Sequence, residues 1–404
     1  MTAMRLPSDQ DASGRSFGPD EIAALTEVLA SGTLTATKGA FTKRFDAAMA
    51  ELIGVEHVVS CSSGSAAVHV AVAGIDPEPG DEIITTSITD MGALTPILYQ
   101  GAIPVFCDVD PVSMNVTAET IAARITSRTR AIIVTHIFGN PCQMDDILAL
   151  AAKHAIPVIE DAAQAYLAQS RGRYVGTMGT IGCFSAQQGK HITSGEGGFV
   201  VTNDAAMARR MRTFVNKAWP YGEANPDHEF IALNYRTTEL QSAVLLAQLP
   251  KLPSHVKVRV ENAARLNAAL AGVPGLGLPE HHPEDVHVFW RYGLRVDDAV
   301  IPGGPGALAA ELKFYDIAAA PRYVNKPAFR CKVFADQVTF GKSRWPFTLA
   351  QPSAVDYSAE LFPGTFAGLD QVLVFPWNEK MTDAHIDFLA TSITEAATKL
   401  AASR

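Results

Sequence analysis

Short apolar runs alternate with amphipathic helical patterns between residues 55 and 205. The runs are apolar on both faces, and the helical segments include SAAVHVAVAGI and MDDILALAAKHA. Strands of this kind belong to a sheet that helices cover on both sides. The pattern therefore predicts an α/β domain with a mostly parallel sheet. Its expected strands are EHVVSC, DEIITT, IPVFCDVD, RAIIVTHI, IPVIED, GCFSAQQ and GGFVVTND.

The pattern changes near residue 250. One long helical pattern spans residues 237–272, and we expect a break near Pro250 and Pro253. The stretch HVFWRYGLRV then predicts a strand, ALAAELKFYDI predicts a helix, and residues 322–365 read as irregular. A final strand, QVLVFPWN, precedes a terminal helix that Thr382 or Asp383 caps. These elements predict a smaller α+β domain.

Residues 1–16 are polar, and we expect them to form a flexible N-terminus. A helix follows, because a proline and two acids suit a first turn and apolar residues recur at helical spacing after Ile22. We therefore expect a large domain over residues 17–250 and a small C-terminal domain over residues 251–404.

Composition excludes several classes of partner. The chain of 404 residues is 48% hydrophobic and has a formal net charge of −9, without a basic patch or a polybasic run. We expect no nucleic acid and no membrane as partners, since no apolar run reaches spanning length. The five cysteines form no CxxC pair, so we expect neither a metal site nor disulfides, in a cytoplasmic protein.

Two stretches suggest a site for a phosphorylated ligand. In CSSGSAAVH, Gly64 permits close backbone approach and Ser65 offers a hydroxyl at the start of a helix. In PVIEDAAQAY, an apolar strand runs into Glu160 and Asp161, with Gln164 further on. Buried acids need partners, and a protonated heterocyclic nitrogen is one candidate. The alternatives are a plain helix cap in each stretch, and one acid of the pair can cap while the other serves chemistry.

Two further stretches complete the candidate constellation. In FSAQQGKHITSGEGG, Ser185 lies on a strand and Lys190 in the loop after it, where desolvation would make an amine nucleophile. In ALNYRTTELQSA, Asn234 and Arg236 precede a helix, and Arg236 binds an anion or supports packing. Alone, each stretch also fits an ordinary loop lysine or a helix cap. Together and in this order, they are what pyridoxal 5'-phosphate requires.

The chain resembles the DegT/DnrJ/EryC1/StrS aminotransferases, which are pyridoxal-phosphate enzymes of the aspartate-aminotransferase-like fold type I. The resemblance rests on the stretches SSGSAAVHVAV, YQGAIPVFCDVDP, VIEDAAQA, GCFSAQQGKHITSGEGG, NYRTTELQSAVLLAQL and FPWNE. It implies an aminotransferase that moves an amino group from L-glutamate or L-glutamine to a keto sugar, a cyclitol ketone or a related ketone in secondary-metabolite or polysaccharide biosynthesis. The sequence leaves the donor and the acceptor open.

The resemblance also implies roles for individual residues. Lys190 would form the Schiff base and carry protons, Asp161 would pair with the ring nitrogen, and Gln164 would contact the ring hydroxyl. The implied phosphate ligands are Gly64, Ser65, Ala66 and Ser185, with Asn234 reaching the phosphate of the neighbouring subunit. The last contact implies a homodimer with composite active sites.

One position departs from the family pattern. Asp90 stands where the family usually has an aromatic side chain that stacks on the cofactor. Either Met91 or another side chain covers the ring, or Asp90 contacts the substrate or cofactor by hydrogen bonding. Arg322 and Tyr323 match a loop near the acceptor and are candidate substrate contacts. Trp290 is interpreted as part of the small-domain fold.

Two alternative functions follow from these observations. Asp90 would permit a pyridoxal-phosphate enzyme with elimination or decarboxylation chemistry. A non-catalytic regulatory relative is disfavoured, because Lys190, Asp161, Gln164 and Ser185 are all present. Some relatives remove a hydroxyl group and have histidine in place of the lysine. Because Lys190 is retained here, the sequence argues against that dehydratase chemistry.

Overall fold

The structure, a computed structural model, describes residues 4–403. Within these residues, a seven-stranded sheet has the order β1-β9-β8-β5-β4-β2-β3. β9 runs antiparallel to both neighbours, and the remaining pairs are parallel, which confirms the mostly parallel sheet. The strands are β1 (His57–Cys61), β2 (Glu82–Thr86), β3 (Ile103–Cys107), β4 (Thr129–Thr135), β5 (Val158–Asp161), β8 (Ile181–Ser185) and β9 (Gly198–Thr202).

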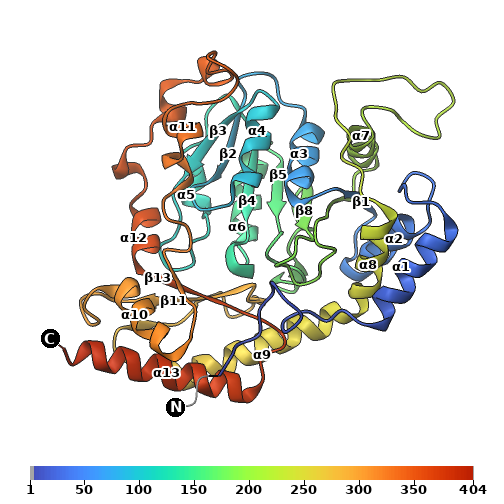
Figure 1. Cartoon of the computed structure of the whole chain (residues 1–404). Helices are drawn as coiled ribbons and strands as arrows, with labels where there is room; N and C mark the ends of the chain where they lie inside the picture. The colour runs from blue at the N-terminus through green and yellow to red at the C-terminus, as the bar shows by residue number, and fades with distance from the viewer. Residues whose placement is uncertain (1–3, 404) are drawn as a thin grey trace.

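Helices cover both faces of this sheet because successive strand residues point to opposite sides. In β4, Ile133 packs into a core with α3 and α7, whereas Ile132 packs with α5 and α6. Figure 1 shows the strands at the centre of the molecule, between helices. The helices of this part are α1 (Pro19–Ser31), α2 (Phe41–Ile53), α3 (Gly64–Ile75), α4 (Thr95–Tyr99), α5 (Ala118–Ala122), α6 (Met144–Lys153), α7 (Ala205–Val215) and α8 (Glu239–Gln248).

The C-terminal part has its own sheet, of order β10-β11-β13-β12 in the described chain, and its own core. This core joins that sheet to α9, α10 and α13, and Figure 1 shows α9 and α13 along the lower side of the molecule. Its elements are α9 (Leu252–Leu270), β10 (Leu276–Gly277), β11 (Arg291–Val296), α10 (Gly304–Leu312), β12 (Ala320–Pro321), α11 (Lys332–Ala335), α12 (Pro363–Gln371), β13 (Val372–Pro376) and α13 (Asp383–Ala401).

The long helical pattern is interrupted where the prolines predict. α8 ends at Gln248, a short 3-10 turn follows, and α9 begins at Leu252 with a proline in its first turn. Thr382 is the N-cap residue of α13, in agreement with the sequence. The boundary between the two domains stays a prediction.

Residues 322–365 are largely irregular, as expected, but α12 begins inside this range at Pro363. The sequence does not reveal α12 because its few apolar residues form no clear helical period. The segment also packs an aromatic cluster against β3, centred on Phe106 and Phe329. This packing holds the segment close to the large sheet.

The N-terminal segment is not the free tail that its composition suggests. Residues 1–3 lie outside the described part, but residues 4–16 contact both parts of the chain, and Asp9 and Arg15 are buried. The physical reason is that Asp9 pairs with arginine side chains that would otherwise be buried without an acid.

No helix within residues 4–403 is both long enough and apolar enough to span a bilayer.

Candidate active site

A cavity of about 490 Å³ opens where β1, β5 and β8 end. Ligands of open α/β sheets bind at such carboxyl ends. The C-terminal part closes the cavity from the other side, through Trp290 and Tyr323. The structure therefore brings most of the predicted site residues together, and those that line the cavity are Gly64, Ser65, Asp90, Asp161, Gln164, Ser185, Lys190 and Tyr323.

The start of α3 forms a tight cradle against the end of β8. A Cβ atom added to Gly64 would lie 2.6 Å from Cβ of Ser185 and 2.8 Å from its Oγ, so only glycine fits. Ser63 caps the helix by accepting a hydrogen bond from the Ala66 amide at 3.1 Å. The positive end of α3 and the hydroxyls of Ser65 and Ser185 thus line one space, which suits an anion.

Glu160 and Asp161 have different roles although they are adjacent. The Glu160 carboxylate accepts hydrogen bonds from the backbone amides of Gly176 and Met178, each at 2.7 Å, and lies 3.1 Å from a ring nitrogen of His136. Burial alone would raise the pKa of Glu160, but these contacts outweigh it and hold the pKa below its ordinary value. Glu160 therefore has a structural role, since it joins the end of β5 to the turn that contains Gly176 and Met178.

Asp161 is the acid that faces the cavity. One of its carboxylate oxygens accepts a hydrogen bond from the Ala163 amide at 3.1 Å. Burial raises the pKa of Asp161, although that amide and the charge of Lys190 oppose the rise. A cationic group bound in the cavity would offset the desolvation of this carboxylate.

Gln164 is fixed by hydrogen bonds at both ends of its amide. Its Oε1 accepts from the Phe138 amide at 2.7 Å, and its Nε2 donates to the Tyr323 hydroxyl at 3.2 Å. Burial raises the pKa of Tyr323 to about 12, so its phenol is neutral at physiological pH. The amide of Gln164 thus has one defined orientation at the cavity wall.

Lys190 lies in the loop between β8 and β9, beside an aromatic ring. Its Nζ is 4.2 Å from the centroid of the Trp290 ring, and the Trp290 indole donates a hydrogen bond to the Gly189 carbonyl at 2.7 Å. Burial lowers the pKa of Lys190 to about 8, against the opposing charge of Asp161. Roughly a tenth of this amine is therefore neutral and nucleophilic at pH 7, far more than for a lysine with an ordinary pKa.

Trp290 lines the cavity, although from the sequence it is interpreted as part of the small-domain fold. It directly precedes β11, and its contact with the Lys190 amine depends on tertiary packing that the local sequence does not reveal. Asp90 does line the cavity and accepts a hydrogen bond from the Gly92 amide at 2.7 Å. The site thus has an acid at the position where the family resemblance implies an aromatic ring, and Trp290 supplies an aromatic ring from the other part of the chain.

Three predicted site residues lie outside the cavity wall. Ala66 is buried within α3. Arg322 forms an ion pair with Asp370 and so points away from the cavity, whereas the neighbouring Tyr323 contacts Gln164. Asn234 is exposed, and its Oδ1 accepts a hydrogen bond from the Arg236 amide at 3.1 Å.

The fold and this site define an α/β enzyme whose cleft combines an amine nucleophile, a buried acid and an anion cradle. The model of the DegT/DnrJ/EryC1/StrS aminotransferase family matches residues 16–355. The chain belongs to this family, and an aminotransferase activity follows from that membership.

Named relatives agree with this assignment. The chain is 36% identical over 271 residues to GDP-perosamine synthase of Caulobacter vibrioides, covering 66% of this chain and 72% of that protein. It is 34% identical over 371 residues to L-glutamine:2-deoxy-scyllo-inosose aminotransferase of Streptomyces fradiae, covering 86% and 84%. The solved aminotransferase TlmJ of Streptoalloteichus hindustanus is 27% identical and matches with a TM-score of 0.82 over 96% of this chain and 98% of that one, which confirms the fold class.

Proposed function

We propose that this enzyme uses pyridoxal 5'-phosphate to move an amino group from L-glutamate or L-glutamine to a keto sugar or cyclitol ketone. The observation that carries the proposal is one cavity that holds Lys190, Asp161 and the cradle at Gly64. The names of the relatives, a perosamine synthase and a scyllo-inosose aminotransferase, support this acceptor class in polysaccharide or secondary-metabolite biosynthesis. The cytoplasmic location stays a prediction.

The residues present fit this cofactor. The close approach of Gly64 to Ser185 leaves backbone amides and hydroxyls for a phosphate, and Ala66 would contribute through the backbone of the same helix turn. Asp161 would face the ring nitrogen, where a protonated nitrogen would supply the cation that this buried carboxylate needs. Gln164 would contact the ring hydroxyl.

The chain's own groups then divide the work. When bound, pyridoxal phosphate supplies an electron sink for the carbanion formed next to the amino group. Asp161 would hold a proton on the ring nitrogen and so keep that sink effective. Lys190 would be the group that moves a proton at Cα of the donor, because its amine lies in the same cavity. A pKa of about 8 lets one amine accept and release that proton near neutral pH.

Asp90 supports a second candidate function, elimination or decarboxylation on the same fold. Its carboxylate lines the cavity and its charge acts on Lys190 and Asp161. An acid there would interact with a cationic or hydroxylated substrate and not stack on a ring. Arg322 and Tyr323 remain candidate acceptor contacts, and the hydrogen bond between Tyr323 and Gln164 supports Tyr323 as the better of the two.

A homodimer with composite sites is part of the proposal. The segment between α7 and α8 projects from the body of the molecule in Figure 1. It exposes Ile231 by 95% and Leu233 by 60%, next to the exposed Asn234. Apolar side chains on a projecting segment favour burial against a second copy, and Asn234 would then reach the phosphate of the partner's cofactor.

Absorption spectroscopy tests the function directly. Purified protein loaded with pyridoxal phosphate should show a visible band that bleaches with glutamate or glutamine and returns with the matching 2-oxo acid. Lys190→Ala should lack the band, whereas Lys257→Ala, at an exposed lysine of α9, should keep it. A wild-type band that bleaches with neither donor would favour the Asp90-dependent alternative. Failure to form any band would overturn the cofactor assignment.

A further inference from the structure

Residues 4–16, here called the N-terminal strap, carry a buried carboxylate in the middle of an arginine cluster. The Asp9 side chain is 4% exposed. It lies 2.8 Å from guanidinium nitrogens of Arg15 and Arg291 and 3.7 Å from one of Arg259. Asn378 also donates a hydrogen bond to it at 2.5 Å. Asp9 therefore joins the strap to α9, to β11 and to the turn after β13.

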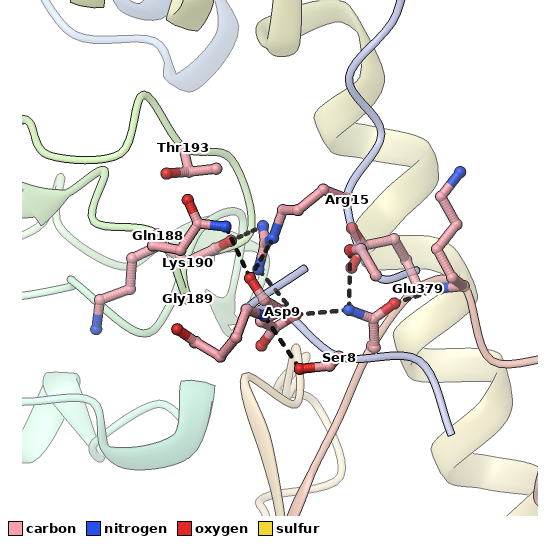
Figure 2. Close-up of polar contacts among 12 residues, drawn as sticks. Ser8, Asp9, Arg15, Gln188, Gly189, Lys190, Thr193 and Glu379 are labelled. Atoms are coloured by element: carbon pink, nitrogen blue, oxygen red, sulfur yellow. Dashed lines mark hydrogen bonds and ion pairs between the residues drawn. The ribbon is translucent and has the colours of Figure 1, made fainter. Parts of the chain in front are cut away.

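The strap also binds the loop that carries Lys190. Arg15 Nη1 donates to the Lys190 carbonyl at 2.9 Å, and Gln188 Nε2 donates to the Asp9 carbonyl at 2.8 Å. Figure 2 shows Asp9 and Arg15 of the strap beside Gln188, Gly189 and Lys190 of the loop. The loop between β8 and β9 is thus held from the strap on both sides of Gly189.

The same cluster reaches the wall of the cavity. The guanidinium carbon of Arg291 lies 4.3 Å from the centroid of the Trp290 ring, and that ring contacts the Lys190 amine. The indole of Trp290 in turn holds the Gly189 carbonyl. Asp9 fixes Arg291, so a single carboxylate supports the Lys190 backbone through Arg15 and the Lys190 side chain through Arg291 and Trp290.

Charge balance makes Asp9 the member on which the others depend. Arg15 and Arg259 are 2% and 0% exposed, and Glu379 is the other acid of the cluster, at 2.7 Å from Arg259. A buried arginine without its acid is strongly unfavourable. Neutralising Asp9 would leave Arg15 and Arg291 without this acid and release them from their present positions.

We infer that Asp9 is a positioning residue for the proposed amine chemistry, and that the strap couples the C-terminal part of the chain to the Lys190 loop. This inference rests on the proposed function, since it assigns to Lys190 the reacting amine. A displacement of a reacting group by about 1 Å costs roughly a hundredfold in rate. Loosening the Lys190 loop should accordingly reduce turnover and leave the binding of the amino-acid donor little changed.

The test compares Asp9→Asn with Asp11→Asn. Asp11 lies in the same strap, two residues away. It is exposed, pairs with Arg5 and accepts hydrogen bonds from Ser13, but it makes none of the contacts to the Lys190 loop described above. Hydrogen exchange of the apoprotein should be roughly tenfold or more faster in residues 186–197 for Asp9→Asn. It should be unchanged for Asp11→Asn, and Asp9→Glu should restore part of the protection.

Spectroscopy of the loaded enzyme supplies the functional readout. The charged groups that act on the Lys190 amine are Asp161, Arg291, Asp90 and Asp9. Loss of the Asp9 charge disfavours the protonated amine, whereas release of Arg291 favours it and is the larger influence, so the pH midpoint of the visible band should shift away from the wild-type value in Asp9→Asn. kcat should fall roughly tenfold or more, with a smaller change in KM for the donor. Asp11→Asn should keep the wild-type midpoint and kcat.

The outcomes separate the two proposals. Equal exchange rates, equal midpoints and equal kcat in Asp9→Asn and Asp11→Asn would overturn the role of Asp9. If Asp9→Asn does not fold, Gln188→Ala provides the second variant, because Gln188 is partly exposed and its loss breaks one bond between strap and loop. Unchanged exchange in that variant would also count against the strap. A wild-type protein without any visible band would refute the cofactor assignment. The hydrogen-exchange data would still show whether the strap holds the Lys190 loop.

Discussion

Gly64→Ala should damage the cradle at the start of α3 through steric overlap. The added Cβ would lie 2.6 Å from Cβ of Ser185 and 2.8 Å from its Oγ. Carbon atoms in contact normally lie about 3.5–4.0 Å apart, so the methyl group intrudes by about 1 Å. Overpacking of this kind costs about 1–3 kcal/mol. Replacing a helix glycine by alanine would otherwise stabilise by about 0.5–1 kcal/mol.

The net expectation is therefore a loss of up to about 2.5 kcal/mol in the stability of the apoprotein, together with weaker cofactor binding. Denaturant unfolding followed by fluorescence and circular dichroism measures the first quantity, and a titration of visible absorbance measures the second. Gly306→Ala is the matched control, because it is also a helix glycine and an added Cβ meets no atom within 4 Å. It should be neutral or slightly stabilising.

A double variant identifies the cause of the damage. Ser185→Gly removes the atoms that the new Cβ would meet, so the stability lost in Gly64→Ala and Ser185→Gly together should be smaller than the sum of the single losses. Cofactor affinity should not recover, since the Ser185 hydroxyl is gone. The steric reasoning is refuted if Gly64→Ala matches Gly306→Ala in both stability and cofactor affinity, or if the two changes are simply additive.

Three further predictions concern the amine, the buried acid and the assembly. The rate at which apoprotein reacts with pyridoxal phosphate at Lys190 should reach half its maximum at about pH 8 and not near 10.5, because the neutral amine reacts; stopped-flow absorbance measures this. Glu160→Gln should cost about 3–5 kcal/mol, measured by denaturant unfolding. Because the folded-state pKa of Glu160 lies below its ordinary 4.5, wild-type stability should fall as pH drops through that lowered value, and this component should be absent in Glu160→Gln. Dimers reassembled from equal amounts of Lys190→Ala and Asn234→Ala chains should recover about a quarter of wild-type activity if sites are composite, and none if each chain is self-sufficient.

The sequence predicts those site residues whose positions follow from strand ends. Gly64, Asp161 and Ser185 each stand where an apolar run stops, and parallel strands bring such ends to one edge of the sheet. Lys190 follows from the loop after β8 and the glycines beyond it. The local pattern is enough for these residues because each lies within a few residues of a strand end that borders the cavity.

The remaining contacts depend on tertiary packing that no local pattern contains. Asp9 and Arg15 stand in a polar segment that resembles a solvated tail, and their burial requires arginines from α9 and β11. Trp290 reads as a core residue of its strand, and its contact with Lys190 arises only when the two parts of the chain meet. Arg322 matches a family position, but its ion pair with Asp370 sets its direction.

The two acids at the end of β5 show how the fold supports the chemistry. Successive strand residues point to opposite faces, so Glu160 faces the turn at residues 176–179 while Asp161 faces the cavity. The backbone amides that bind Glu160 fix the end of β5, and the register of β4 with β5 pairs Thr135 with Asp161. Asp161 therefore keeps a defined position as a buried acid, because Glu160 binds the backbone amides of the adjacent turn and fixes the end of the strand. Exchanging the two identities would lose both functions, since a glutamate in the cavity and an aspartate at the turn differ in reach by one methylene.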